Sequence, residues 1–140
     1  MIHIDVPNRV PSWHLNFEEG IYFLVGGRDK GVLIILDTFC DANGIASILI
    51  DDETSKEDIL NSCRGKKVVL VDDANELLDE SLLDKISQVK GVEIIIASFN
   101  QFYYSEREGV QYKYLVDTPE LITTYDINVR VGVKNERMHT

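Results

Sequence analysis

The sequence predicts a single α/β domain, residues 1–140, built around a mainly parallel sheet. Four short segments are apolar throughout or nearly so, as strands buried on both faces of a sheet are: residues 21–25, 46–50, 67–71 and 92–97. The segments between them are long enough for helices. Strands of this kind that alternate with helices form parallel sheets with helices on both faces, and this pattern is the basis of the prediction.

Length and composition fit one soluble globular domain. A chain of 140 residues buries roughly two-thirds of its unfolded surface in one core. The hydrophobic fraction of 44% and the charged fraction of 27% are those of an ordinary folded protein, with no low-complexity tract. We therefore expect order along most of the chain.

The net charge narrows the classes of partner. The 24 acidic residues exceed the 14 basic ones by ten, so the summed field repels a phosphate backbone. Nucleic-acid binding is disfavoured, and a protein partner or a homodimer is expected instead. An acidic surface also fits an inhibitor or DNA mimic that binds a basic protein, and this alternative stays open.

Cysteines, histidines and apolar runs exclude several other classes. Cys40 and Cys63 are far apart and are expected to be buried, reduced thiols. The histidines are isolated, so neither a zinc site nor a nucleophile with a nearby base is indicated. No apolar run approaches the ~18–20 residues of a membrane span, and the first residues lack signal-peptide features, which together predict a cytoplasmic protein.

The segment 32–42 has two interpretations. It is apolar almost all round and is followed by Asn43-Gly44, a good helix stop, so we expect a buried helix before the strand at 45–50. The alternative is a hairpin over residues 21–36, because the same apolar residues also suit a strand. The helix is favoured because residues 40–44 would have no role in a hairpin.

Two further helices are predicted. Thr54-Ser55-Lys56-Glu57 has the spacing of a capping box and is expected to open a helix that runs to about Cys63. Apolar residues at intervals of three and four predict an amphipathic helix that ends at Lys90-Gly91, and these are Leu78, Leu82, Ile86 and Val89.

The two ends of the chain differ from the centre. Residues 1–20 hold prolines and a few alternating apolar positions, and end in what looks like a turn before a strand. Residues 112–116 and 127–133 alternate apolar and polar side chains, which predicts antiparallel edge strands. Thr118-Pro119-Glu120 between them is expected to form one short helical turn.

A glycine-rich segment follows the first buried strand. It has the G-x-x-x-x-G spacing of a phosphate-binding loop, and its candidate cofactor-binding residues are Gly26, Gly27, Arg28, Asp29, Lys30 and Gly31. An intact loop continues with a lysine and a hydroxyl, but here Val32 and Leu33 follow. Lys30, which precedes Gly31, is the candidate to reach a phosphate from the neighbouring position instead. The alternative is an ordinary polar turn.

Paired carboxylates follow the strand at 67–71. Asp72 and Asp73 stand where the carboxyl edge of a sheet would place a metal-orienting acid and a water-activating acid. Asp72 is the candidate ligand for Mg²⁺, and both are candidate catalytic residues only if the protein is active. Otherwise such residues cap the next helix or stay solvated.

The order of these motifs resembles the core of P-loop NTPases, closest in spacing to ABC-type ATPases. Asp72-Asp73-Ala74-Asn75-Glu76-Leu77-Leu78-Asp79 is similar to their Walker B and D-loop run. Leu24-Val25-Gly26 resembles the approach to their Walker A loop, and Ile94-Ile95-Ile96-Ala97-Ser98 resembles their final core strand. The resemblance covers roughly residues 15–100 and implies a three-layer domain.

Three departures qualify what the resemblance implies. Val32 and Leu33 replace the Walker lysine and hydroxyl, Phe99 replaces the switch histidine, and no L-S-G-G-Q signature or segment long enough to carry it is present. The resemblance therefore implies a catalytically inactive domain that acts as a binding or regulatory module, with no cofactor expected. The alternative is a weak ATP- or GTP-binding protein or NTPase that uses Lys30, Asp72, Asp73 and Mg²⁺.

Overall fold

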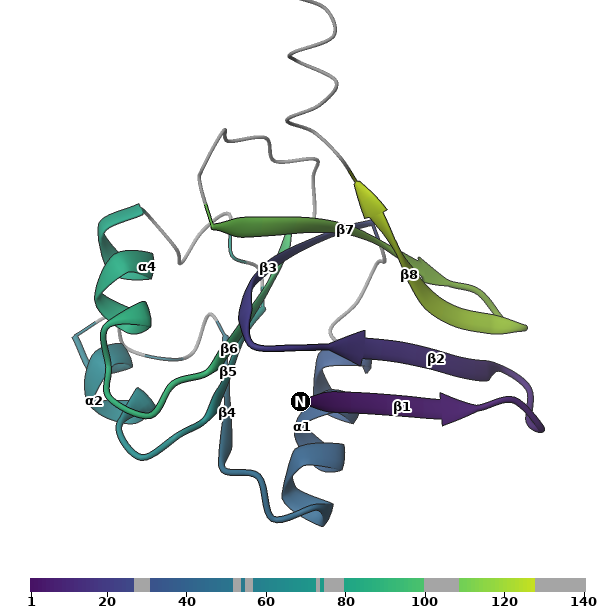
Figure 1. Cartoon of the computed structure of the whole chain (residues 1–140), viewed down its shortest axis with the longest axis horizontal. Helices are drawn as coiled ribbons and strands as arrows, with labels where there is room; N and C mark the ends of the chain where they lie inside the picture. The colour runs from purple at the N-terminus through teal and green to yellow at the C-terminus, as the bar shows by residue number, and fades with distance from the viewer. Residues whose placement is uncertain are drawn as a thin grey trace, which may run out of the picture.

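A computed structural model describes residues 1–26, 31–51, 54, 57–72, 74, 80–99 and 109–127. The strands are β1 (Ile2–Val6), β2 (Ser12–Phe17), β3 (Gly20–Gly26), β4 (Ser47–Ile50), β5 (Val68–Val71), β6 (Ile94–Phe99), β7 (Val110–Asp117) and β8 (Leu121–Ile127). The helices are α1 (Gly31–Ala42), α2 (Ile59–Cys63) and α4 (Glu80–Ser87). The fold is α/β, with one curled, eight-stranded mixed sheet in the order β1-β2-β8-β7-β3-β6-β5-β4 (Figure 1).

The predicted parallel core is confirmed. β3 pairs with β6, β6 with β5, and β5 with β4, all in parallel. Helix α1 follows β3 and packs on one face of these strands, whereas α2 and α4 follow β4 and β5 and pack on the other face. Every side chain of β5 is buried, as its wholly apolar sequence requires between two covered faces.

Residues 31–42 form a helix, so the hairpin alternative is wrong. β4 is the outermost of the parallel strands, with β6 and β5 between it and β3. The chain must therefore cross over the sheet from β3 to β4, and a connection between parallel strands is usually a helix. The helix ends at Ala42, directly before the predicted stop Asn43-Gly44. Gly44 has a φ of +70°, and the Ile45 N–H donates to the Cys40 carbonyl at 2.8 Å.

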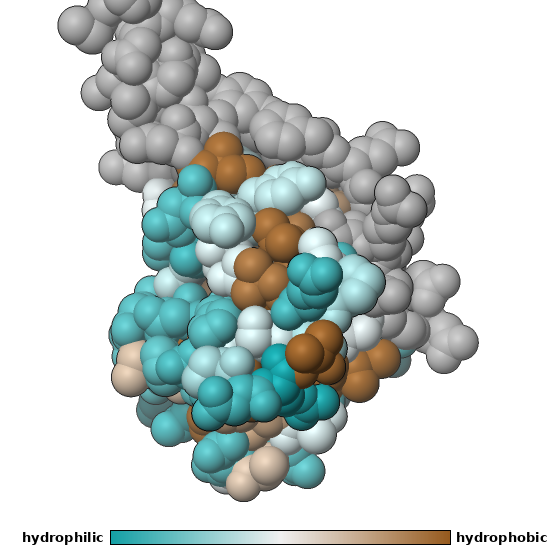
Figure 2. Space-filling view, turned by 90° about the vertical axis from the view of Figure 1, so that its right-hand side faces the viewer, coloured by the Kyte–Doolittle hydropathy of each residue, from teal (hydrophilic) through white to brown (hydrophobic). Residues whose placement is uncertain are grey.

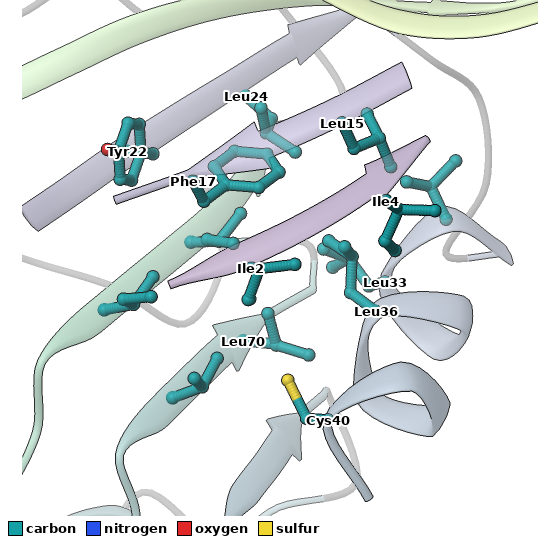
Figure 3. Close-up of a cluster of buried hydrophobic side chains, with 14 of the residues drawn as sticks. Ile2, Ile4, Leu15, Phe17, Tyr22, Leu24, Leu33, Leu36, Cys40 and Leu70 are labelled. Atoms are coloured by element: carbon teal, nitrogen blue, oxygen red, sulfur yellow. The ribbon is translucent and has the colours of Figure 1, made fainter. Parts of the chain in front are cut away.

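Helix α1 is buried on one side only. Leu36 and Cys40 are fully buried in the core cluster drawn in Figure 3, where they lie beside Leu33 and Leu70. The segment is apolar almost all round in sequence, but the predicted buried helix is buried on one side only, because its other side faces away from the sheet. Ile34 and Ile35, on that side, are 44% and 39% exposed.

The two faces of the sheet hold separate apolar clusters. The cluster under α1 includes side chains from β1 and β2, such as Ile2 and Phe17 (Figure 3). The opposite cluster contains Phe23, whose ring lies 4.9 Å from that of Phe99 and 5.5 Å from that of Tyr112, centroid to centroid. These contacts join β3 to its two neighbours, β6 and β7.

Both cysteines are buried and reduced, as predicted. Cys40 lies in the cluster under α1 and Cys63 in the opposite one. Burial raises the pKa of each thiol, and the nearby Asp37 carboxylate raises the pKa of Cys40 further. Both therefore act as apolar core groups.

The first 20 residues form a β-hairpin that the sequence analysis did not predict. β1 and β2 pair in antiparallel fashion, with Ile4 opposite Leu15. Alternate side chains point into the core under α1, including Trp13 and Leu15. The alternating apolar residues of this segment were the signal that could have predicted its strands. They could not have shown the place of the hairpin in the sheet, because β2 joins the other strands through β8, which is more than 100 residues away in sequence.

The C-terminal strands are antiparallel to each other, as predicted, but their description as edge strands is wrong. β7 lies between β3 and β8, and β8 lies between β7 and β2. β7 runs parallel to β3, and Tyr112 is buried against Phe23. The second strand is Leu121–Ile127, and residues 128–133 of the predicted strand lie outside the described residues.

The predicted helical turn at residues 118–120 is instead the turn of the β7–β8 hairpin. The Thr118 N–H donates to the Leu121 carbonyl at 3.0 Å, which closes the turn. The Thr118 hydroxyl accepts from the Leu121 N–H at 3.0 Å and from the Glu120 N–H at 3.3 Å. Thr118 therefore stabilises the turn itself.

The bounds of the two other predicted helices need correction. α2 begins at Ile59, and the Thr54 hydroxyl accepts from the Asp51 N–H at 3.3 Å, so Thr54 closes a turn after β4 rather than capping a helix. α4 ends at Ser87, before Lys90, and buries Leu83 beside Ile86. Leu78 lies outside the described residues.

None of the helices in the described part of the chain is long and apolar enough to cross a membrane.

Candidate functional site

The described ends of the predicted loop lie at the carboxyl edge of the parallel strands. Gly26 is the last residue of β3, and Gly31 is the first residue of α1. Gly27, Arg28, Asp29 and Lys30 lie outside the described residues. The connection from a buried strand to a helix, which the sequence predicted for this segment, is confirmed.

Two requirements at Gly26 favour glycine over any other residue. Its φ is +81°, in the left-handed region that side chains disfavour. A Cβ at this position would lie 2.9 Å from Cε2 of Tyr114 and 3.0 Å from the Leu115 carbonyl oxygen. The ring of Tyr114, a half-exposed residue of β7, therefore lies directly against the start of the loop.

A pair of glycine substitutions separates these two requirements. Gly44 has a similar φ of +70° but no atom within 4 Å of an added Cβ. We expect Gly44→Ala to cost about 1–2 kcal/mol of unfolding free energy from the backbone alone. Gly26→Ala should cost at least about 1 kcal/mol more, because the Tyr114 ring and the β7 backbone must shift. Urea unfolding of both variants measures the difference, and equal losses would contradict the close packing at Gly26.

Asp72 lies at the same edge of the sheet, two strands from Gly26. It follows β5 directly, and its N–H donates to the Ile50 carbonyl at 2.8 Å, which extends the ladder between β4 and β5. Only β6 separates β5 from β3, so the two strands are about 10 Å apart at the usual strand spacing. In the register through β6, Val71 is level with Phe23, so β3 runs further along this edge than β5 does. Asp73, the second predicted carboxylate, lies outside the described residues.

The two positions after Gly31 belong to the core. Val32 and Leu33 are each 2% exposed and lie in the apolar cluster under α1. In a nucleotide-binding loop these positions present a lysine and a hydroxyl to the phosphates and the metal. Here the first turn of α1 packs both side chains among apolar neighbours, where neither offers a charge or a metal ligand.

Metal binding at Asp72 finds no support in the residues that the structure describes. Among them, no three His, Cys, Asp or Glu side chains are grouped closely enough to hold a metal ion. Asp51 follows β4 at the same edge as Asp72, but two carboxylates alone make a weak Mg²⁺ site.

A second polar region, which the sequence did not indicate, lies between the N-terminal hairpin and β8. The described pairing of β2 with β8 stops at His14 and Thr123, although both strands continue. Beyond that point a pocket of about 520 Å³ opens, and Asn16, Lys113 and Tyr125 are among its lining residues.

Polar contacts link several of the side chains that line this pocket. Nδ1 of His14 lies 2.6 Å from the Asp5 carboxylate across the β1–β2 hairpin. The Lys113 ammonium donates to Asp126 at 2.8 Å and lies 5.6 Å from the centre of the Tyr22 ring. The Lys113 side chain is only 14% exposed, so it covers the Phe17 and Tyr22 rings of the apolar cluster under α1. Its ammonium adds a cation–π interaction with these rings.

Among the residues that the structure describes, the face at the tips of the two hairpins carries no extensive apolar patch. Figure 2 views the molecule from this side, and its hydrophobic side chains are interspersed with hydrophilic ones. Val10, in the β1–β2 turn, is 79% exposed. Single exposed apolar residues of this kind are normal and do not indicate a binding site.

The described geometry thus brings the glycine-loop strand, Tyr114 and Asp72 to one edge of the sheet, and it turns Val32 and Leu33 away from that edge.

No protein-family model matches the sequence, and a search of curated proteins finds no significant match.

Proposed function

We propose that this chain is a three-layer P-loop NTPase-like domain that has no NTPase activity and acts as a protein-binding or regulatory module. The observation that carries the proposal is the burial of Val32 and Leu33 beside a strand-to-helix glycine loop. The loop position fits a phosphate site, while the two side chains that would work there are part of the core.

The arrangement of strands supports the P-loop-like part of the proposal. β3 and β5 both end at the carboxyl edge, with the parallel strand β6 between them. The chain leaves β3 through α1 on one face of the sheet and leaves β5 through α4 on the other. In open α/β sheets, ligand sites lie at the carboxyl edge where successive connections diverge in this way.

The lack of activity follows from the requirements of phosphoryl transfer. That reaction needs cations at the terminal phosphates and a firmly held metal, and removal of such groups lowers the rate by orders of magnitude. Val32 and Leu33 supply neither a cation for the phosphates nor a ligand for the metal, and Asp72 alone would hold magnesium loosely. The net charge of -10 adds repulsion against a nucleotide.

Surface and charge favour a protein as the binding partner. The acidic balance opposes nucleic acid, and α1, the helix that follows the loop, exposes Ile34 and Ile35 side by side in sequence. We take these two neighbouring apolar side chains as the candidate contact with that partner.

Phosphate release measured beside ATP and GTP titrations tests the absence of activity. We expect the purified protein, with Mg²⁺, to release phosphate no faster than its Asp72→Asn and Asp73→Asn variants, which control for contaminating ATPase. Backbone amides of a glycine loop bind anions such as sulfate, so binding without turnover agrees with the proposal. Turnover that is lost in both variants would contradict it and would favour the weak NTPase that uses Lys30, Asp72 and Asp73.

A further inference from the structure

We propose that β1 is the site at which two copies of this chain pair edge to edge, in antiparallel fashion about a twofold axis at Ile4. This inference rests on the proposed role as a protein-binding module, and it names the partner as a second copy. It would extend each eight-stranded sheet across the dimer.

The first argument is the position of β1 in the sheet. Among the described strands, β1 and β4 are the two outermost, and β1 has β2 on one side only (Figure 1). An outer strand presents a row of backbone N–H and C=O groups that can pair with another strand. β1 has five residues and contains no proline or lysine, the residues that commonly protect such edges.

The second argument is the self-complementary sequence Ile2-His3-Ile4-Asp5-Val6. Antiparallel pairing about Ile4 places His3 of one copy opposite Asp5 of the other, twice by symmetry, as an isologous interface requires. Both side chains are exposed on the outer face of the hairpin. Ile2 and Val6 of opposite copies would also lie side by side, which would cover Val6, now 37% exposed.

The hairpin itself contains the contact that the dimer would repeat. In the β1–β2 register Asp5 lies opposite His14, and Oδ1 of Asp5 is 2.6 Å from Nδ1 of His14. The second carboxylate oxygen of Asp5 can accept from His3 of the other copy on the opposite side of the strand, because an imidazole donates an N–H in either charge state. Such pairs matter here because two copies of an acidic chain otherwise repel each other.

The other outermost strand lacks this complementarity. β4 is shorter, Ser47–Ile50, and carries no charged residue within its bounds. The acidic run Asp51-Asp52-Glu53 follows it directly, so pairing of two β4 strands would add acidic charge at the contact without an opposite charge. The charge pattern therefore favours β1.

Sedimentation equilibrium over a range of protein concentrations tests the pairing. An interface of five residues a side is small, so we expect a weak dimer with a dissociation constant on the order of 100 µM. His3→Asp places Asp opposite Asp5 twice and should raise that constant about tenfold or more. Asn16→Asp adds a negative charge to the same face but on β2, so it is the matched control and should leave the constant nearly unchanged.

A mixture of two variants provides the decisive comparison. Asp5→Lys alone should also weaken the dimer, but mixed with His3→Asp it should form a heterodimer in which lysine faces aspartate. A wild-type chain that stays monomeric at about ten times that dissociation constant would overturn the proposal. Equal weakening by Asn16→Asp, or no heterodimer in the mixture, would overturn it too. Phosphate release is measured in a separate assay, so a failure of the pairing leaves the proposed lack of turnover standing.

Discussion

Leu36→Ala is expected to lower the free energy of unfolding by about 2–5 kcal/mol. Leu36 is fully buried in the cluster between α1 and the sheet, close to Leu33 and Cys40 (Figure 3). Truncation removes apolar contacts and leaves a cavity that the packed strands beneath cannot close fully. Urea unfolding followed by circular dichroism measures the loss.

Ile35→Ala is the matched control for this prediction. Ile35 is the preceding residue of the same helix and is 39% exposed, so its truncation should cost well under about 2 kcal/mol. A negligible loss for Leu36→Ala, or equal losses for both variants, would show that α1 does not bury the side described above.

Val32→Lys, which restores a lysine directly after the glycine loop, is expected to destabilise the protein by about 3–5 kcal/mol rather than to create a nucleotide site. Val32 is 2% exposed and faces the apolar cluster under α1, so an ammonium there would be buried without a partner. The expected result is a large drop in the thermal midpoint and no phosphate release with ATP and Mg²⁺.

Ile34→Lys controls for the introduction of a lysine into the same helix. Ile34 is 44% exposed, so the variant should melt close to the wild-type temperature. If instead Val32→Lys were as stable as Ile34→Lys and bound ATP, position 32 would face the loop. The proposed reason for inactivity would then be wrong.

The sequence by itself determined the parallel core. The wholly apolar β5 and the apolar start of β6 can be buried only between two covered faces, and the segments between strands have the length of helices. The helical assignment of residues 31–42 also followed from the sequence, because Asn43-Gly44 supplies a local stop signal. Local signals of this kind act within one element and need no distant partner.

The sequence also placed the ends of the candidate site. A glycine loop was predicted after one buried strand, and a carboxylate at the carboxyl edge of the sheet after another; Gly26 and Asp72 both lie at that edge. The burial of the helix at residues 32–42 was predicted, but the choice of the side that faces the sheet was not. It depends on how α1 sits on the sheet, which packing against β1 and β2 helps to set.

Only the tertiary structure decided the position of the outer strands. β7 is only partly buried, with Tyr112 and Leu115 as its buried residues, yet it lies inside the sheet, because it pairs with β3 and with β8. The N-terminal hairpin joins the rest of the sheet where residues 12–14 of β2 pair with residues 121–123 of β8. The identity of a strand's neighbours depends on contacts between residues far apart in sequence. Periodicity within a strand reports which side chains are buried but not which strand lies beside it.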